Sequence, residues 1–238
     1  MHMFTESELP SAPLPVDAVL PPYRPANLEI VDFRHSLCEV ATNGFVHFEE
    51  GFSTLVSAEM TREVETFEAL LSPTRYAHFA DLRNQRIDRI IFGDSRSRYF
   101  TIDQLRALPR INELIESIES QVVAATGLKE HVRPEEWYVN EVYINRIPPR
   151  GKIKRHQDEG LTLFSVIITL AGEATITMYK DPKSGKGVPL RHGPGSMTFY
   201  REPGLLGPNG DQTESLWHSS LTGSNELRWG LAIGYKSE

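Results

Sequence analysis

The fold of this chain is decided by Asn145-Arg-Ile-Pro-Pro-Arg-Gly-Lys-Ile-Lys-Arg-His-Gln-Asp158. Its centre, Pro-Pro-Arg-Gly at positions 148–151, is a turn sequence and predicts two strands joined by a tight connection. Residues two apart on an extended strand point to the same side, so His156 and Asp158 would present an imidazole and a carboxylate together. One further histidine would complete a 2-His-1-carboxylate triad, which suits non-heme Fe(II) and leaves coordination positions open.

The residues that follow favour a metal site over the alternative, which is an ordinary pair of surface residues on a strand. A bare His-x-Asp occurs by chance in many chains. Here, however, residues 163–170 form a β-branched apolar run that is typical of a buried strand. Residues 174–179 follow as another strand across Ala-Gly-Glu. Such a succession would frame a metal site in a small barrel or jelly roll.

A third ligand and an anchor for a carboxylate are predicted near the C-terminus. His218 is the best third ligand because it follows Trp217 and precedes a final strand; the alternative is a core histidine satisfied by a backbone carbonyl. On that strand Arg228 shares one face with small side chains, which leaves a cavity with a cation at its end. A guanidinium there would bind a carboxylate through two hydrogen bonds, and a structural salt bridge is the alternative. The apolar face holds Leu227, Trp229, Leu231 and Ile233, and the other face holds Arg228, Gly230, Ala232 and Gly234.

These residues resemble the AlkB family of oxygenases. The family pattern Asn-Arg-x-x-Pro-x-x-Lys-x-x-x-His-Gln-Asp fits residues 145–158 in register. Weaker likenesses are residues 44–52 with the acidic helix that follows to about Leu71, an amphipathic helix after Leu108-Pro, and residues 193–200. The amphipathic helix carries the apolar stripe Ile111, Leu114, Ile115 and Ile118. The resemblance implies an α+β fold with a double-stranded β-helix (jelly-roll) core, to which the N-terminal half adds helices and a lid hairpin.

The resemblance also implies an activity, that of an Fe(II)/2-oxoglutarate-dependent dioxygenase, which hydroxylates or demethylates its substrate with O2. His156, Asp158 and His218 would bind the iron, while Asn145, Tyr143 and Arg228 would bind 2-oxoglutarate. For Tyr143 an ordinary half-buried strand aromatic is the alternative. Residues 83–100 would form the lid, with a hairpin at Gly93-Asp-Ser, and the lid would present Arg96, Arg98 and Tyr99 to the substrate.

Three positions depart from the family pattern. Ile147 stands where the family often has a tyrosine, and Gly234 stands where it has a second arginine. Both changes affect the expected binding of the co-substrate. Gly160 replaces an acid with which nucleobase repair enzymes touch the base. The pocket would therefore be roomier and hold fewer polar groups.

Length and composition bear on the number of domains and on the cellular location. The chain has 238 residues, a net charge of −7 and a single cysteine, Cys38. An internal disulfide is therefore excluded, and no apolar run reaches the length of a membrane span. Residues 1–27 are predicted to be a Pro-rich extension and residues 28–238 a single dioxygenase domain. A cytoplasmic location, or a nuclear one in a eukaryote, is the default expectation.

The substrate is the least determined part of the prediction. Residues 83–98 and 146–155 are rich in Arg and Lys and would lie near the site, which favours alkylated bases in DNA or RNA; ordinary solvated loop charge is the alternative. The net acidity, Gly160 and the glycine-rich face of the last strand favour a small metabolite or a protein side chain instead. A binding module without catalysis is a third class, which the complete triad disfavours. The oligomeric state is left open.

Overall fold

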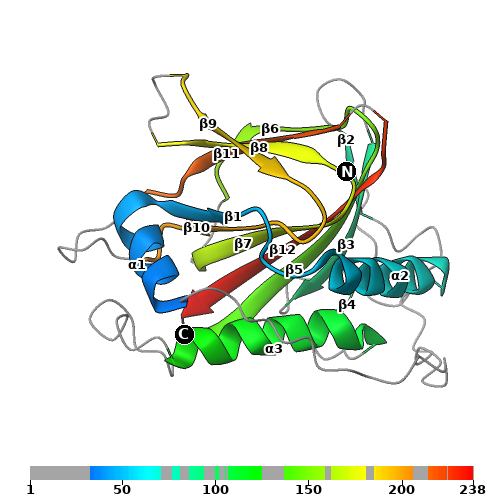
Figure 1. Ribbon diagram of the computed structural model, residues 1–238, viewed down its shortest axis with the longest axis horizontal. Helices are drawn as coiled ribbons and strands as arrows, with labels where there is room; N and C mark the ends of the chain where they lie inside the picture. The colour runs from blue at the N-terminus through cyan, green and yellow to red at the C-terminus, as the bar shows by residue number, and fades with distance from the viewer. Residues whose placement is uncertain are drawn as a thin grey trace, which may run out of the picture.

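Two facing sheets with helices on one side make up the fold (Figure 1). The computed structural model describes residues 33–70, 77–80, 86–93, 100–101, 105, 107–124, 137–158, 162–180, 185–205, 214–223 and 225–237. Within these residues, eight strands form a large sheet and four form a small one. The large sheet runs in the order β1 (Phe45–Phe48), β10 (Met197–Arg201), β7 (Thr162–Ala171), β12 (Arg228–Ser237), β5 (Trp137–Ile147), β3 (Arg86–Gly93) and β2 (Ala77–Ala80), with β4 (Phe100–Thr101) beside β3. The small sheet runs in the order β6 (Lys152–His156), β11 (Trp217–Thr222), β8 (Ala174–Tyr179) and β9 (Val188–His192).

The order of the strands along the chain confirms the predicted jelly-roll core. From β5 to β8 each successive strand lies in the other sheet, and the same alternation runs from β9 through β12. The chain therefore crosses repeatedly between the two sheets, as in a double-stranded β-helix. The inner faces of both sheets meet between them, and the predicted site residues come from strands of both.

The predicted turn at positions 148–151 joins β5 to β6. Arg150 takes a positive φ of 59°, and the Gly151 amide donates to the Pro148 carbonyl at 2.8 Å. A Cβ on Gly151 would lie 2.5 Å from Cγ2 of Ile147, so only glycine closes this turn. The Arg150 amide also donates to the Gly223 carbonyl at 2.9 Å, which ties the turn to the end of β11.

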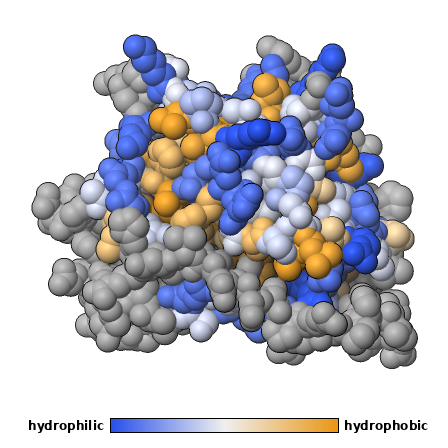
Figure 2. Space-filling model, in the orientation of Figure 1, coloured by the Kyte–Doolittle hydropathy of each residue, from blue (hydrophilic) through white to orange (hydrophobic). Residues whose placement is uncertain are grey.

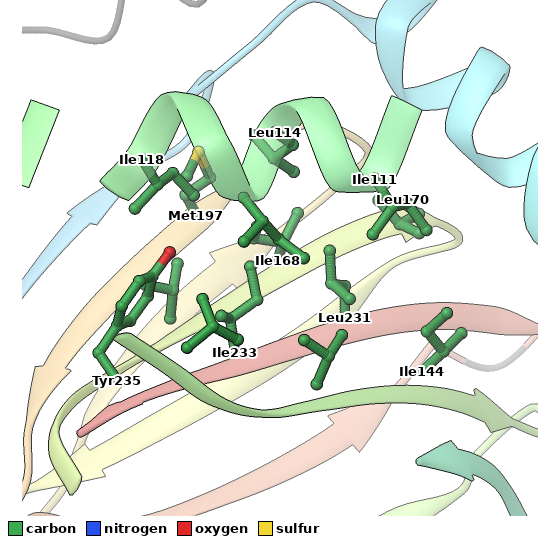
Figure 3. Packing of buried hydrophobic residues seen from close by; sticks show 14 of the residues in the cluster. Ile111, Leu114, Ile118, Ile144, Ile168, Leu170, Met197, Leu231, Ile233 and Tyr235 are labelled. Carbon is green, nitrogen blue, oxygen red and sulfur yellow. The ribbon is translucent and has the colours of Figure 1, made fainter. Parts of the chain in front are cut away.

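Three helices cover the outer face of the large sheet: α1 (Phe33–Asn43), α2 (Thr54–Leu70) and α3 (Pro109–Ala124). The predicted stripe on α3 is confirmed, because all four of its side chains are buried. Figure 3 shows Ile111, Leu114 and Ile118 pointing from α3 onto Ile168, Leu231 and Ile233 of the sheet. The apolar face of the last strand thus packs as predicted, which leaves its other face to the interior between the sheets. Among the helices described, none combines the length and apolar character that a membrane span requires.

The N-terminus of α3 is capped by a side chain from α2. The carboxylate of Glu63 accepts the backbone N–H of Arg110 at 2.9 Å and that of Ile111 at 3.1 Å. These two donors have no partner within the helix, so the contact replaces water that burial removes. Glu63 is buried, and burial, opposed by these hydrogen bonds, raises its pKa to about 7.

Glu63→Ala is expected to lower the free energy of unfolding by about 1–2 kcal/mol, because it removes a cap and leaves two buried N–H groups without acceptors. Urea denaturation measures the difference. Glu59→Ala is the matched control: Glu59 pairs with Arg110 at 3.5 Å but is partly exposed, so its loss should change stability by less than about 0.5 kcal/mol. Equal effects of the two substitutions would contradict the capping role.

The region predicted as a lid differs from expectation where it can be described. β3 and β4 pair in parallel, with Phe92 opposite Phe100, so these two strands are not the arms of an antiparallel hairpin; Asp94 and Ser95 lie outside the described residues. The antiparallel pair is instead β2 with β3. The pattern of glycine and polar residues marked a break in the chain but could not set the direction of the next strand. Arg96, Arg98 and Tyr99, like Gly160 and the extension 1–27, lie outside the described residues.

Candidate active site

Neighbouring strands of the small sheet bring the three predicted metal ligands together. His156 ends β6 and is the register partner of His218 on β11, so both imidazoles lie on the inward face of the sheet. Asp158 follows two residues later and turns its carboxylate toward both rings. One ligand atom from each of the three residues lies within 4.8 Å of the other two. The cluster can be reached from outside, because the Asp158 side chain is 42 % exposed.

Backbone carbonyls fix which nitrogen of each histidine carries the proton. Nδ1 of His156 lies 2.7 Å from the Lys154 carbonyl, and Nδ1 of His218 lies 3.2 Å from the Leu216 carbonyl. A carbonyl oxygen can only accept, so Nδ1 is the protonated nitrogen in both rings. Each Nε2 therefore presents a lone pair, as a metal ligand must, and the carbonyls hold the two rings in orientation.

The spacing of the three groups fits one divalent cation. Two ligand atoms that each lie roughly 2.1 Å from an ion, at right angles, are about 3 Å apart. Nε2 of His156 lies 3.5 Å from Oδ1 of Asp158, and Nε2 of His218 lies 3.7 Å from Oδ2. Both separations are close to that value. Two imidazoles and one carboxylate, without a thiolate, are the donor set that suits Fe(II).

The charges at the cluster also suit a cation. Burial favours a higher pKa for Asp158, but the nearby side chains of His156, His218 and Tyr200 outweigh it and hold the pKa well below its usual range. Burial lowers the pKa of His218, which keeps that ring neutral. One ionised carboxylate thus faces neutral imidazole, and binding a cation requires no proton to leave the carboxylate.

Two residues beside the triad were missed in the sequence. The Tyr200 hydroxyl donates to Oδ2 of Asp158 at 2.6 Å, and its ring centroid lies 4.8 Å from that of His218. Glu202 is fully buried; it accepts from Ser165 at 3.1 Å and from Ser215 at 2.6 Å. Burial and the neighbouring Asp158 raise the pKa of Glu202 to about 9, so it is neutral at pH 7. The sequence offered one signal for Tyr200: side chains alternate along β10, and this alternation puts Tyr200 on the inward face of the sheet.

Arg228 is buried without an acidic partner among the described residues. The side chain is 2 % exposed. One terminal nitrogen donates to Ser220 Oγ at 2.6 Å, while Nε has no hydrogen-bond partner. A Cβ on Gly230 would lie 3.5 Å from the guanidinium carbon, so the cation lies over this glycine as the strand pattern suggested. Burial lowers the pKa of Arg228 to about 10, so it stays charged and requires an anion. The alternative of a structural salt bridge has no support in this part of the chain.

The other two residues predicted to hold the co-substrate come from β5, beside Arg228. Asn145 is buried and pairs in register with Gly230, and Tyr143 pairs with Ala232. Both therefore share the inward face with the small side chains of β12. Ile147, which stands where the family often has tyrosine, is buried opposite Arg228. The structure thus brings Asn145, Tyr143 and Arg228 to one wall of the interior.

His192 and His47 also lie in the interior. His192 ends β9 and is fully buried, and His47 lies on β1 of the large sheet. Both rings contact the hydroxyl of Thr198, at 2.7 Å from Nε2 of His192 and 2.9 Å from Nδ1 of His47. Burial, with the charge of Arg228, lowers the pKa of His192 to about 2, so this ring is neutral. β9 is a short strand in which exposed and buried side chains alternate near His192, so its sequence shows few apolar residues.

Part of the predicted basic surface takes part in the fold. Arg146 pairs with Glu68 of α2, with 3.5 Å between Nε and the carboxylate. The guanidinium of Arg155 lies over the ring of Tyr179 at 4.2 Å and near that of Trp217 at 5.5 Å. Neither arginine is simply a solvated loop charge, as the alternative supposed. Both already have partners within the fold, so neither is available only for an anionic ligand such as nucleic acid.

Comparison with known proteins identifies the fold. No protein-family model matches the sequence, and no curated protein matches it significantly. Among solved structures, a prolyl-4-hydroxylase from Pseudomonas putida superposes with a TM-score of 0.58 at 11 % identity, over 86 % of this chain and 98 % of that one. An oxidoreductase of the 2OG-Fe(II) oxygenase family from Burkholderia pseudomallei gives 0.54 at 15 % identity, over 87 % and 92 %. The dioxygenase for auxin oxidation 1 from Arabidopsis thaliana gives 0.57 at 16 % identity, over 88 % and 90 %.

The class of fold is therefore that of the Fe(II)/2-oxoglutarate oxygenases. At these identities the superpositions establish the fold alone. They do not single out the AlkB family from others that share the jelly-roll core. The finer assignment depends on the spaced motif at residues 145–158.

Proposed function

We propose that this chain is an Fe(II)- and 2-oxoglutarate-dependent dioxygenase of AlkB-like type. The observation that carries the proposal is the triad, in which two imidazole Nε2 atoms with fixed tautomers face one ionised carboxylate. His156, Asp158 and His218 would hold the iron. Arg228 would hold the distal carboxylate of 2-oxoglutarate, with Asn145 and Tyr143 on the same wall. Superposition on oxygenases of known structure supports the same reading.

The chemistry is divided between the cofactors and the chain. Fe(II), with 2-oxoglutarate and O2, supplies the oxidation of a substrate C–H bond, which on an N-methyl group ends in demethylation. The chain binds the ion, orients the co-substrate through Arg228 and keeps water out. Figure 2 shows apolar residues gathered on this face of the molecule, with hydrophilic residues around and between them. An apolar cluster lies between the sheets near the triad: Ile176, Met178, Leu190, Tyr200 and Leu216, with Phe45 and Ile167 against it.

A peptide or a small metabolite is the favoured substrate class. Matched structures include a prolyl hydroxylase in complex with a peptide fragment and the auxin dioxygenase. The net charge of −7 is unfavourable for a phosphate backbone. Moreover, Arg146 and Arg155 have partners within the fold. The alternative, an alkylated base in DNA or RNA, is supported by the AlkB-like motif and the remaining basic residues of 150–154.

Succinate formation is the direct test. With Fe(II), 2-oxoglutarate and O2, the purified chain is expected to release succinate, and a matching substrate should raise the rate about tenfold or more, because substrate binding completes the site. The panel comprises proline-containing and N-methylated peptides, small carboxylate metabolites, and methylated DNA and RNA oligonucleotides. A sample with chelated iron is the blank. Succinate at the level of the blank with every substrate and without any, together with failure to bind iron, would overturn the proposal.

Salt dependence distinguishes the substrate classes within the same experiment. Binding of a methylated oligonucleotide through phosphate contacts weakens steeply with added salt, whereas binding of a small neutral substrate hardly changes. We expect little oligonucleotide binding at 0.1 M salt, on the order of physiological ionic strength. Turnover of an oligonucleotide together with a steep salt slope would transfer the preference to the nucleic-acid alternative.

A further inference from the structure

Tyr200 contacts two of the three proposed metal ligands from the opposite sheet. Its hydroxyl lies 2.6 Å from Oδ2 of Asp158, and its ring lies against that of His218 with 4.8 Å between centroids. The side chain comes from β10 of the large sheet, whereas both histidines belong to the small sheet. It is 2 % exposed. A donor from one sheet thus fixes a carboxylate that follows a strand of the other.

The two oxygens of Asp158 have different surroundings. Oδ2 accepts the Tyr200 hydroxyl and lies 3.7 Å from Nε2 of His218, while Oδ1 lies 3.5 Å from Nε2 of His156 and is not bonded to the phenol. The Tyr200 bond is short, and a hydrogen bond to an ionised acceptor is about twice as strong as one between neutral groups. Oδ1 is thereby the oxygen that can approach a cation, and Oδ2 is held back by the phenol.

We propose that Tyr200 is a positioning residue that holds Asp158 in coordination through one oxygen only. This inference rests on the metal site of the proposed function. A facial triad with a one-oxygen carboxylate leaves three positions for co-substrate and oxygen. A carboxylate bound through both oxygens would occupy one of them. Tyr200 acts only through Asp158 and the His218 ring, and it has no role in the chemistry itself.

The neighbouring structure keeps Tyr200 in place. On β10, Tyr200 pairs with Phe45 of β1 on one side and with Ser165 of β7 on the other. Its ring belongs to the apolar cluster between the sheets. The phenol oxygen is therefore held in one position relative to Asp158. A fixed position is needed if the phenol is to bind one carboxylate oxygen and leave the other for the metal.

Co(II) titration of the metal-free protein tests the inference without any turnover. Tyr200→Phe removes the hydroxyl and keeps the ring, so the fold should persist. We expect the Kd for Co(II) to rise about tenfold, as is usual when a hydrogen bond to a ligand is lost. The visible absorption of bound Co(II) should also change in position and intensity, because a second carboxylate oxygen enters coordination. Tyr200→Met, a second variant without the hydroxyl, should show the same spectrum.

Tyr179→Phe is the matched control. Tyr179 also donates or accepts a hydrogen bond through its hydroxyl, with Ser219 at 3.3 Å, but it packs against Arg155 away from the triad. Its Co(II) affinity and spectrum should equal those of the parent. If the Tyr200 variants retain both the parental affinity and the parental spectrum, or only lower the melting temperature, the inference is overturned. Failure of the parent itself to bind Co(II) would overturn the proposed metal site instead.

Discussion

Asp158→Ala is expected to abolish iron binding and turnover while the protein stays folded. Loss of a residue that merely supports a ligand costs about 10–100-fold in affinity or activity, so loss of the anionic ligand should cost more. With two neutral imidazoles left, the site also lacks the charge that balances the cation. Iron per chain, measured after desalting, should fall from near one to background. Succinate formation should disappear with it.

The fold should survive this substitution because Asp158 carries little of it. Its side chain is 42 % exposed, and Tyr200 is the hydrogen-bond partner that loses an acceptor. Thermal unfolding of the metal-free variant should therefore match that of the parent within a few degrees, about 1 kcal/mol for a chain of this size. Glu173→Ala is the control: it removes an exposed carboxylate that pairs with Arg191, and iron binding should be unchanged. Parental iron content in Asp158→Ala would remove the metal site from the proposal.

The parts of the structure that sequence predicted well are those encoded by neighbouring residues. The turn at residues 148–151 follows from its own prolines and glycine, and Gly151 has no room for a side chain. The two faces of β12 follow from alternation, which put Trp229, Leu231 and Ile233 into the core and Arg228 over Gly230. The side chains of His156 and Asp158 were expected on one side because they are two residues apart, and they lie 3.5 Å from each other. Local patterns of this kind need no knowledge of which strands are neighbours.

The parts that sequence could not predict depend on contacts between distant strands. Tyr200 reaches Asp158 across 42 positions of sequence, and no residue near either one indicates the pairing. His192 and His47 come together only because β9 and β1 belong to facing sheets, with 4.8 Å between the ring centroids. The pairing of β4 was unpredictable for the same reason, because a turn signal at Gly93 does not set whether the next strand pairs in parallel with β3.

Arg228→Met is expected to weaken 2-oxoglutarate binding about tenfold or more without lowering the stability of the protein. A hydrogen bond to a charged group contributes about 1.5–3 kcal/mol, and about 1.4 kcal/mol corresponds to a factor of ten in Kd. Calorimetric titration of 2-oxoglutarate into the protein loaded with Mn(II) measures the change without turnover. Arg228→Lys keeps the charge but loses the planar fork, so its Kd should lie between those of the parent and Arg228→Met.

Stability separates the co-substrate role of Arg228 from a structural one. Arg228 is a buried cation that donates to Ser220 and has no acid beside it in the described part of the chain, so its burial is costly in the absence of an anion. Methionine of similar length removes that cost, so the free energy of unfolding without 2-oxoglutarate should be maintained or increased. A structural salt bridge would give the opposite result, because breaking one costs about 3–5 kcal/mol. Arg191→Met, which removes an exposed arginine paired with Glu173, should leave both quantities unchanged. A destabilised Arg228→Met with parental affinity for 2-oxoglutarate would place the carboxylate anchor elsewhere, with Tyr143 and Asn145 on the same wall the next residues to test.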